Sequence, residues 1–518
     1  EKCQKNFREW LKNKYGTLDK LNASWWTGFW SHKYTDWDQI HSPSPQGECL
    51  TTALTLDWKR FSSEQITDFC KMEADALREF SDLPTTTNMM GFFKGVDYNT
   101  LKNAVDIISW DNYPFWHERK DEVPEAVYTS AGNALMRSLK REPFLLMEST
   151  PSSVSWRSHN PLKRPGMHML SSMQAVAHGA DSVQYFQWRK SRGGYEKFHG
   201  AVVDHKNGSD TRTFREVTEV GKRLEHLSGG IKTFLNRAKA AIVFDWENWW
   251  AVEDTSGPRQ DLDYVKCVTD HYRAFWECGL DVDFVSMDDD FSGYRLLAAP
   301  LNYMYKKGYS EKVRAFVEAG GTYVTTYFSG IVNETDLCFI GRHPLEDVLG
   351  VVSEEMDAPS KEFENCFDYN GKEYPAYTMC DIVHAKAKTE IYSVYKKDFY
   401  KGCPVVTENA YGSGRAYYLS AESDQRFLSA FYKDVFIKAG LLKEASSADR
   451  ILKRLPHGVT AAKREDETGR KGLVFVMNFN DRQVRLEGIG KQIDAESGEV
   501  YENVLEMAPF SCTILKLK

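Results

Sequence analysis

The stretch Pro143-Phe144-Leu145-Leu146-Met147-Glu148-Ser149-Thr150-Pro151 is an unbroken apolar run that ends at a carboxylate. Four consecutive apolar residues between a proline and a polar turn predict a strand that is buried on both faces. Glu148 then lies at the carboxyl end of that strand, the edge where ligands and catalytic groups gather in sheets crossed over by helices. On this stretch alone, a surface or capping glutamate is the commoner alternative, and the neighbouring segments decide between the two.

Three further apolar runs surround this strand, and helical patterns separate them. The runs span residues 85–90, 105–110 and 182–186, and the segment 167–178 has a helical pattern. Strands and helices that alternate at this spacing predict right-handed βαβ units and a parallel sheet. Four such units within residues 1–230 are typical of the C-terminal half of a (β/α)8 TIM barrel, whose full length is usually about 250 residues or more.

The pattern restarts after Gly230. Apolar runs at 240–244, 282–285, 296–299 and 322–326 alternate with helical patterns at 265–279 and 310–319. This order predicts a doubly wound α/β domain over residues 231–445. Short alternating segments follow, such as 472–478 and 511–517, and they predict a small antiparallel β domain over residues 446–518. The predicted fold class is therefore α/β, in three domains.

Composition argues against two classes of partner. A net charge of −8 without a basic patch disfavours nucleic acid, because such binding depends on Lys and Arg neutralising phosphates. No stretch approaches the roughly 18 to 20 continuous apolar residues of a membrane span. The ten cysteines are scattered, which favours a reducing, cytoplasmic setting over a secreted disulfide framework. The 14 Trp, 26 Tyr and 29 Phe residues fit the stacking of sugar rings, and they fit a large core equally well.

Polar and aromatic side chains follow three of the four early strands. Asp111-Asn112-Tyr113 ends the second strand, Glu148 ends the third with Trp156 shortly after it, and the fourth leads on to Glu196 and His199. A carboxylate, aromatic rings and hydrogen-bonding groups on one rim are what cleavage of a glycosidic bond requires. One carboxylate attacks the anomeric carbon or stabilises charge there, a second protonates the leaving oxygen, and polar groups bind the ring hydroxyls.

Several motifs together resemble the β-galactosidases of glycoside hydrolase family 42. They are Met147-Glu148 with Trp156 eight residues later, Trp110-Asp111-Asn112-Tyr113-Pro114, Phe29-Trp30-Ser31, and Glu196-x-x-His199. The resemblance covers nearly all 518 residues, and its motifs are specific in the barrel half and weak in the last domain.

The resemblance implies a retaining enzyme that removes terminal β-D-galactosyl residues from a β-galactoside oligosaccharide and needs no cofactor for catalysis. Glu148 matches the nucleophile. Tyr113, Trp156, Glu196 and His199 match positions that hold galactose, and Trp30 matches an aromatic wall of the pocket. The middle domain resembles the family's trimerisation domain, which shares its fold with class I glutamine amidotransferases. A homotrimer is therefore expected, and the absence of a Gly-x-Cys-x-Gly elbow disfavours amidotransferase activity.

One departure from the family concerns the start of the chain. The resemblance places the acid/base glutamate, in an Asn-Glu motif, shortly before Glu1, so we expect that the chain is entered part-way. A half barrel leaves two sheet edges unpaired, and residues 1–518 alone are expected neither to fold nor to turn over substrate. Cys3 resembles the end of a cysteine cluster that holds one structural zinc in many members, and such thiolate sets are typical of closed zinc sites. A lone cysteine is equally consistent with an ordinary buried thiol.

Alternatives remain for the function and for individual residues. A non-catalytic carbohydrate-binding or scaffold protein would keep the pocket without the acid, and an α-L-arabinopyranosidase would keep the mechanism and change the sugar. Among single residues, His199 is more often structural, and the run Asp288-Asp289-Asp290 is more often a solvated loop than a metal site. Trp246, Trp249 and Trp250 follow a strand end and are expected to cover a subunit interface or the mouth of the pocket.

Overall fold

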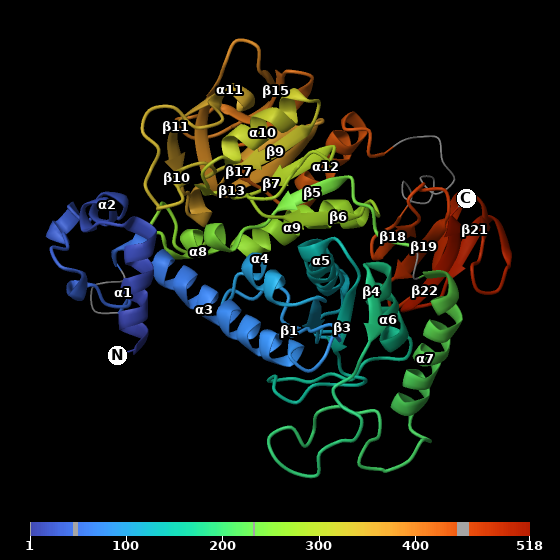
Figure 1. Ribbon diagram of the computed structural model, residues 1–518. Helices are drawn as coiled ribbons and strands as arrows, with labels where there is room; N and C mark the ends of the chain where they lie inside the picture. Colours follow the sequence, from blue (N-terminus) through green and yellow to red (C-terminus); the bar gives the residue numbers. More distant parts are fainter. Residues whose placement is uncertain (1, 45–49, 232–233, 443–454, 518) are drawn as a thin grey trace.

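The computed structural model describes residues 2–44, 50–231, 234–442 and 455–517. Figure 1 shows three parts in chain order: a blue-to-teal part, a green-to-orange part above it, and a red part beside the carboxyl end. The predicted boundary at residues 445 and 446 lies outside the described residues, so the position of that boundary stays a prediction.

The first part is built around a parallel sheet with the strand order β1-β2-β3-β4. Its strands are β1 (Asn88–Met89), β2 (Ser109–Asp111), β3 (Phe144–Glu148) and β4 (Ala180–Val183). Its helices are α1 (Lys2–Tyr15), α2 (Leu18–Ser24), α3 (Thr52–Arg78), α4 (Tyr98–Leu101), α5 (Val123–Lys140), α6 (Met167–Ala177) and α7 (Arg212–Ile231). Four parallel strands with helices between them are the predicted arrangement, so the βαβ units are confirmed.

The strand that carries Glu148 is covered unevenly. Phe144 and Leu146 are buried, whereas Leu145 and Met147 are half-buried. Because successive side chains of a strand point to opposite faces, one face of β3 is fully covered and the other is covered only in part by the described residues. The prediction of a strand buried on both faces is therefore wrong for the face that bears Leu145 and Met147.

The long helix α3 leaves the large apolar side chains of its second half exposed. Ile66, Phe69, Leu77 and Phe80, on or just after α3, are all exposed, and Phe80 retains 87% of its accessible surface. The helix instead buries its first half, where Leu54, Leu56 and Phe61 lie in the core.

The middle part contains a seven-stranded sheet in the order β14-β15-β16-β9-β7-β5-β6. Its parallel strands include β5 (Ala240–Val243), β6 (Val282–Val285), β7 (Leu296–Ala299) and β9 (Thr322–Thr326). The helices are α8 (Trp246–Asp254), α9 (Tyr264–Glu277), α10 (Tyr309–Glu318), α11 (Glu346–Leu349) and α12 (Gln425–Lys438). The antiparallel edge is β14 (Glu390–Val394), β15 (Pro404–Tyr411) and β16 (Gly414–Leu419). Helices and parallel strands alternate as predicted for a doubly wound domain.

A second sheet in this part was not predicted from the sequence. It joins β11 (Val351–Asp357), β12 (Asn365–Tyr369), β13 (Lys372–Ala385) and β17 (Ala421–Glu422). Most of β11 is exposed, and the pairings of β13 with β11 and β17 contain register shifts, so neither strand shows a regular apolar alternation. A further short pair joins β8 (Met304–Tyr305) to β10 (Val332–Asn333).

The last part is a small antiparallel β domain, as predicted. Its strands are β18 (Val459–Glu465), β19 (Gly472–Asn478), β20 (Val484–Ile493), β21 (Val500–Met507) and β22 (Ser511–Leu517). Arg464 on β18 is fully buried and ties this domain to the first part. Its guanidinium donates to the carbonyl oxygens of Val176 and Ala180, at 3.2 Å each, and to Asp181 Oδ1 at 3.0 Å.

Two general features concern the environment of the chain. Across the described ranges, no helix combines the length and the apolar character that crossing a membrane would need. The cysteines of those ranges are all free thiols, and Cys49 falls outside them.

Candidate active site

Glu148 lies at the carboxyl end of β3, and two side chains from neighbouring strands hold its carboxylate. The Tyr113 hydroxyl donates to Oε2 at 2.6 Å, and the Asn88 amide donates to Oε1 at 3.2 Å. Tyr113 follows β2 and Asn88 belongs to β1, so both donors come from the same edge of the sheet. A carboxylate that is held on both oxygens has a fixed orientation, which is what a nucleophile requires.

A second carboxylate, Asp111, lies beside Glu148. Asn88 Nδ2 is 2.9 and 3.0 Å from the two Asp111 oxygens, so one amide group serves both acids. Burial raises the pKa of Asp111 to about 6, the Asn88 hydrogen bond opposes this shift, and the nearby charge of Glu148 adds to it. Two carboxylates that share one donor influence each other's charge state.

Tyr113 is held as a hydrogen-bond donor. Its pKa is raised well above the usual range by burial, by the hydrogen bond to Glu148, and by the charges of Glu148, Asp111 and Glu196. The phenol therefore keeps its proton and points it at Glu148. Arg157 fixes the backbone of this turn, because its guanidinium donates to the carbonyl oxygens of Tyr113 and Pro114.

An aromatic wall stands next to this group. The rings of Trp156 and His199 stack with centroids 5.0 Å apart and an interplanar angle of 24°. Tyr113 meets both rings edge-on, at 5.0 Å from Trp156 and 5.7 Å from His199. Trp156 retains 40% of its accessible surface, so an indole face remains for a ligand. The structure thus brings together Glu148, Tyr113, Trp156 and His199, as the sequence predicted.

His199 is completely buried, and one of its ring nitrogens lacks a protein partner. Nδ1 lies 2.9 Å from the carbonyl oxygen of Gly200, whereas Nε2 makes no hydrogen bond to any residue of the described ranges. A buried polar atom without a partner is costly, and a ligand hydroxyl would remove that cost. Glu196 is half-buried and accepts from the His199 backbone N–H at 2.9 Å through its carbonyl oxygen.

Close backbone packing places His199 against the end of β3. A Cβ added to Gly200 would lie 2.4 Å from Ser152 Oγ and 2.6 Å from Thr150 Oγ1. The Gly200 N–H also donates to the Ser153 carbonyl oxygen at 2.7 Å. Only glycine allows this approach, so the loop after β4 is docked onto the turn that follows Glu148.

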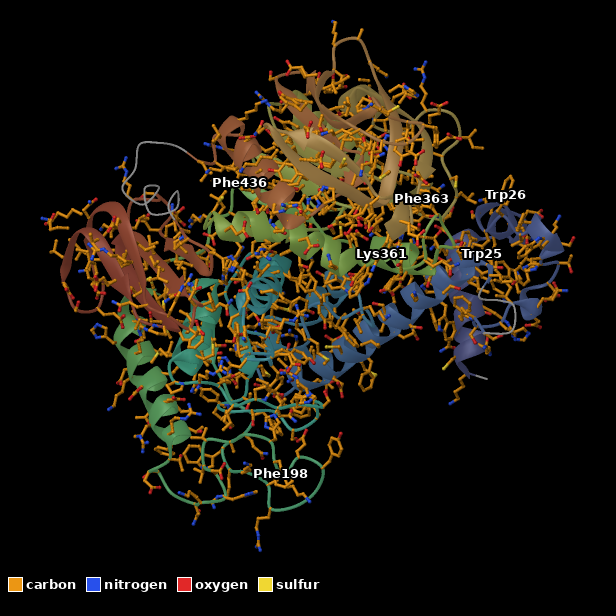
Figure 2. All side chains as sticks on the ribbon, turned by 180° about the vertical axis from the view of Figure 1, so that it is seen from behind. Trp25, Trp26, Phe198, Lys361, Phe363 and Phe436 are labelled. Atoms are coloured by element: carbon orange, nitrogen blue, oxygen red, sulfur yellow. The ribbon has the colours of Figure 1, made fainter. Side chains whose placement is uncertain are left out.

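Trp30 lies elsewhere in this chain. It is 65% exposed and lines a separate cavity of about 440 Å3, together with Trp25, Trp26 and residues 335–340 of the middle part. Figure 2 shows Trp25 and Trp26 far from Phe198, which belongs to the loop of Glu196 and His199. The structure therefore does not bring Trp30 to Glu148 within one chain, and its role as a wall of the galactose pocket stays a prediction.

The predicted metal ligand is also isolated. Cys3 is exposed on α1, and within the described ranges no group of three or more His, Cys, Asp or Glu side chains is placed to hold a metal ion. Asp288 forms an ion pair with Lys306 at 3.2 Å, and Asp289 accepts from the Ser286 N–H at 2.7 Å. The structural zinc at Cys3 stays a prediction.

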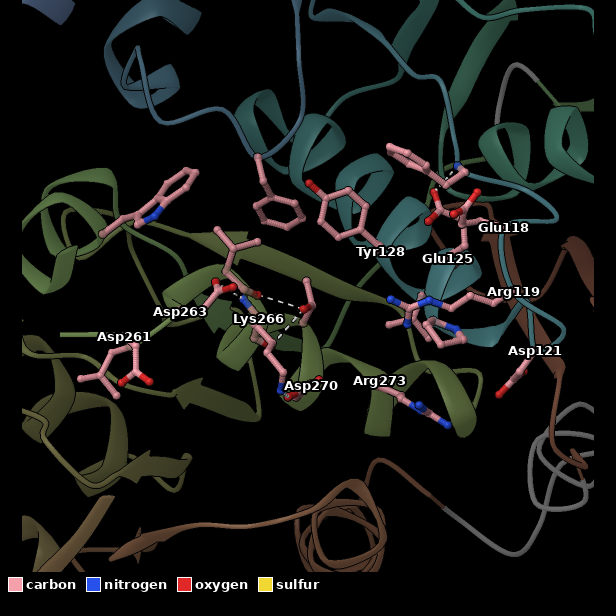
Figure 3. A pocket seen from close by; sticks show the side chains of 18 of the residues that line it. Glu118, Arg119, Asp121, Glu125, Tyr128, Asp261, Asp263, Lys266, Asp270 and Arg273 are labelled. Atoms are coloured by element: carbon pink, nitrogen blue, oxygen red, sulfur yellow. Dashed lines mark hydrogen bonds and ion pairs between the residues drawn. The ribbon is translucent and has the colours of Figure 1, made fainter. Parts of the chain in front are cut away.

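A larger cleft, of about 1140 Å3, lies between α5 and α9. Figure 3 shows Glu118, Arg119 and Glu125 on one side of it, and Asp263, Lys266 and Arg273 on the other. None of the six predicted site residues of the barrel lines this cleft, although Phe115, two residues beyond Tyr113, does. It therefore lies behind the turn that carries Tyr113.

Sequence reasoning missed the roles of Asn88 and Asp111. Asp111 is part of the quoted motif, and its place at a strand end was the available signal. Asn88 carried a weaker signal, because β1 has two residues and the predicted run 85–90 did not show where the strand stops.

Comparison with known proteins places the chain in a family. Residues 1–227 match the model of the β-galactosidases of glycoside hydrolase family 42, and residues 238–442 match the β-galactosidase trimerisation domain. β-Galactosidase BglY of Alicyclobacillus acidocaldarius is 47% identical over 492 residues, which are 92% of this chain and 69% of that protein. The chain belongs to glycoside hydrolase family 42. Its family resemblance, stated above from the motifs, is confirmed.

Other relatives of this family 42 chain support the same family assignment. β-Galactosidase Pbg of Clostridium perfringens is 43% identical, with 100% of this chain and 76% of that protein aligned. The crystal structure of the β-galactosidase from Rahnella sp. R3 superposes with a TM-score of 0.94 at 46% identity, over 99% of this chain and 75% of that one. This similarity confirms the predicted fold class: part of a TIM barrel, an α/β trimerisation domain and a small β domain.

Proposed function

We propose that this glycoside hydrolase chain acts as a retaining β-galactosidase, with Glu148 as the nucleophile. The observation that carries the proposal is the Glu148 carboxylate, held at a strand end by Tyr113 and Asn88 beside the Trp156 ring. The names of its relatives BglY and Pbg, both β-galactosidases, supply the substrate class.

The proposed reaction proceeds in two displacements. A Glu148 oxygen attacks carbon 1 of the galactosyl unit while the bond to the leaving oxygen breaks, and that oxygen takes a proton from a second carboxylic acid. The covalent galactosyl-enzyme is then hydrolysed by water, which attacks from the opposite face and restores the β configuration. Glu148 supplies one of the two carboxylates that this mechanism requires.

The surrounding residues have separate proposed roles. Trp156 offers an exposed indole face for the apolar C–H face of the sugar, and His199 Nε2 and Glu196 are polar groups for ring hydroxyls. Tyr113 remains bonded to Glu148 and keeps one of its oxygens in place during attack.

The test replaces Glu148 by glutamine in the complete protein and measures hydrolysis of a nitrophenyl β-galactoside. We expect kcat to fall by about three orders of magnitude or more, because removal of a nucleophile removes the covalent route. Glu142→Gln is the matched control, since Glu142 is an exposed glutamate just before the same strand. Unchanged hydrolysis by Glu148→Gln would contradict the proposal.

A second measurement tests the role of Glu148 as nucleophile. In Glu148→Ala, added azide should occupy the vacated space and restore turnover, and the product should be the α-galactosyl azide because only one displacement occurs. A β-configured product would show that Glu148 is not the nucleophile. Parallel assays with a nitrophenyl α-L-arabinopyranoside would reveal whether the pocket prefers a ring without the hydroxymethyl group.

We also propose that the protein is a homotrimer, since residues 238–442 match a trimerisation domain. The proposed domains are residues 1–230, 231–445 and 446–518. Size-exclusion chromatography with light scattering checks the assembly, and a monomer at micromolar concentration would contradict it.

A further inference from the structure

Asn88, the donor shared by Glu148 and Asp111, belongs to a very short strand. β1 forms two register pairs with β2, in which Asn88 lies opposite Ser109 and Met89 opposite Trp110. Two pairs of strand contacts fix a chain less firmly than the five or six residues of an average strand. The residues before Asn88 are bonded to β2 and the residues just before it, because the Thr86 hydroxyl donates to the Ile107 carbonyl oxygen at 2.7 Å and the Ser109 hydroxyl donates to the Thr87 carbonyl oxygen at 2.9 Å. The position of Asn88 therefore depends on both flanks, and the flank that follows it is held by another part of the molecule.

That segment, residues 90–97, crosses to the middle part and is held there by two buried tryptophans of α8. The Trp246 indole N–H donates to the Phe93 carbonyl oxygen at 2.9 Å, and the Trp250 indole N–H donates to the Lys94 carbonyl oxygen at 2.7 Å. Trp246 and Trp250 are 1% and 2% exposed, whereas the two acceptors belong to the exposed residues Phe93 and Lys94, so both bonds are partly buried. A buried indole N–H that loses its acceptor is left without a hydrogen bond, which is costly.

The start of α8 is itself fixed. Asp245 caps the helix by accepting from the N–H groups of Glu247 and Asn248, at 3.0 and 3.4 Å. Trp246 and Trp250 are four residues apart and therefore lie on the same face of α8, toward the barrel.

The beginning of the segment is also held, because Tyr98 contacts both Met90 and Trp246 of α8. The Met90 N–H donates to the Tyr98 hydroxyl at 2.8 Å, and the Tyr98 ring lies 5.2 Å from that of Trp246. Gly91 lies between the residues bonded to Tyr98 and to Trp246, and it passes so close to Trp110 that an added Cβ would be 2.8 Å from the ring. The chain is thus confined from Met90 to Lys94, immediately after Asn88.

There is also space into which the segment could shift. Phe92 lines the cleft between α5 and α9, and so do Trp249 and Glu253 of α8. Phe92 itself packs on Phe244 and Tyr128, with ring centroids 5.2 and 5.6 Å apart, and the two indole bonds hold the next two residues, Phe93 and Lys94.

We propose that Trp246 and Trp250 of the trimerisation domain are positioning residues of the hydrolytic site, which hold residues 90–97 so that Asn88 stays bonded to Glu148 and Asp111. This inference rests on the proposed function of Glu148. The tryptophan run was expected to cover a subunit interface or the mouth of the pocket, and the structure gives two of its members a different partner, the backbone of the barrel.

The helix supplies a matched control. Trp249 is also buried, at 6% exposure, and its indole N–H donates to Glu253 within α8, at 2.8 Å. Glu253 also pairs with the exposed Lys94 at 3.2 Å, and Trp249→Phe leaves both members of that ion pair in place. A phenylalanine at 246, 249 or 250 removes the same N–H group and leaves a similar cavity. Only the substitutions at 246 and 250 remove a bond to the segment.

The experiment measures kcat, KM and the melting temperature of Trp246→Phe, Trp249→Phe and Trp250→Phe in the complete protein, each also combined with Asn88→Ala. We expect kcat to fall about tenfold in the variants at 246 and 250 and less than about twofold in Trp249→Phe, with KM little changed, because a misplaced group costs rate more than binding. In the Asn88→Ala background the tryptophan substitutions should lower kcat no further, because the group that they position is gone.

Several results would overturn the inference. Equal kcat in all three tryptophan variants, with only the melting temperature lowered, would assign a purely structural role. Losses that multiply with that of Asn88→Ala would show that the tryptophans do not act through Asn88, and so would an Asn88→Ala variant with unchanged kcat. If Trp250→Phe fails to fold, Trp246→Phe carries the same expectations. Failure of the proposed function appears separately, as full activity in Glu148→Gln.

Discussion

The two parallel sheets of this molecule differ in how they are covered. Every residue of β5, β6, β7 and β9 in the middle part is buried. In the barrel part, β3 has two buried residues among half-covered ones and β4 has only its first residue buried, and polar side chains gather at the strand ends. The comparison shows a division of roles: the middle sheet contributes mainly stability, and the barrel sheet contributes mainly chemistry.

A leucine-to-alanine substitution in each sheet should give the largest difference between them, measured as the loss in free energy of unfolding. Leu297 on β7 is fully buried, and Leu145 on β3 is half-buried. Leu297→Ala should lower the free energy of unfolding by about 2 to 5 kcal/mol, because it removes buried methyl groups and leaves a cavity. Leu145→Ala should cost about half as much. Denaturant unfolding of both variants measures this, and equal losses would break the comparison.

Tyr113→Phe, unlike the leucine substitutions, should lower activity rather than stability. It removes the hydroxyl that donates to Glu148 and keeps the ring against Trp156 and His199. We expect kcat to fall about a hundredfold, or about 2.7 kcal/mol in activation free energy, with little change in the melting temperature. Steady-state kinetics and calorimetry check this. A variant that melts much earlier but keeps its kcat would assign Tyr113 to stability.

The junction between the sheets should show a smaller, pH-dependent effect. Asp97 ends the segment 90–97, and burial raises its pKa to about 7, with the Asp245 charge adding to the shift and Lys306 opposing it. The folded protein therefore binds this proton more tightly than the unfolded chain does, so the contribution of Asp97 to stability is greatest at low pH and is lost as pH rises from about 4 to 7. Asp97→Asn should match the wild type near pH 4 and exceed its free energy of unfolding by about 2 kcal/mol at pH 8.

An aspartate with the opposite shift provides the control for Asp97. The Thr85 backbone N–H, followed by the Arg78 guanidinium, lowers the pKa of Asp106 to about 2. Its charged form is thus favoured by folding, and Asp106→Asn should lose stability above pH 4 relative to the wild type. Melting curves of both variants between pH 4 and 8 test the pair. Parallel curves for the two variants would show that burial does not set the proton affinity of Asp97.

The sequence predicted the buried strands better than the half-covered ones. The predicted ranges 282–285, 296–299 and 322–326 coincide with β6, β7 and β9, because a strand covered on both faces is a continuous apolar run. The ranges 85–90 and 105–110 were longer than β1 and β2. Three threonines with high strand propensity precede β1, and the apolar residues Val105, Ile107 and Ile108 precede β2 outside the ladder. The sheet of β11 and β13 was missed because β11 is mostly exposed and β13 pairs with register shifts, so neither strand has a regular apolar period.

In the candidate site too, the residues that belong to a local sequence pattern were predicted and the others were not. Glu148, Tyr113, Trp156 and His199 were predicted by motif and lie together in the structure. Asn88 was missed because its function depends on three-dimensional neighbours, and nothing in a lone asparagine reveals that two carboxylates share it. Trp30 was assigned by motif alone, and its place beside residues 335–340 depends on tertiary packing that a motif does not encode.

The buried Arg464 has a consequence for how the protein melts. If the small β domain detached, its guanidinium would leave two carbonyl oxygens and a carboxylate beside β4 without their donor. Such a loss opposes piecemeal opening, so the terminal strands and the barrel should come apart together, in a single heat-absorption peak rather than two. A module that looks like an appendage would then be thermodynamically inseparable from the sheet that bears the nucleophile.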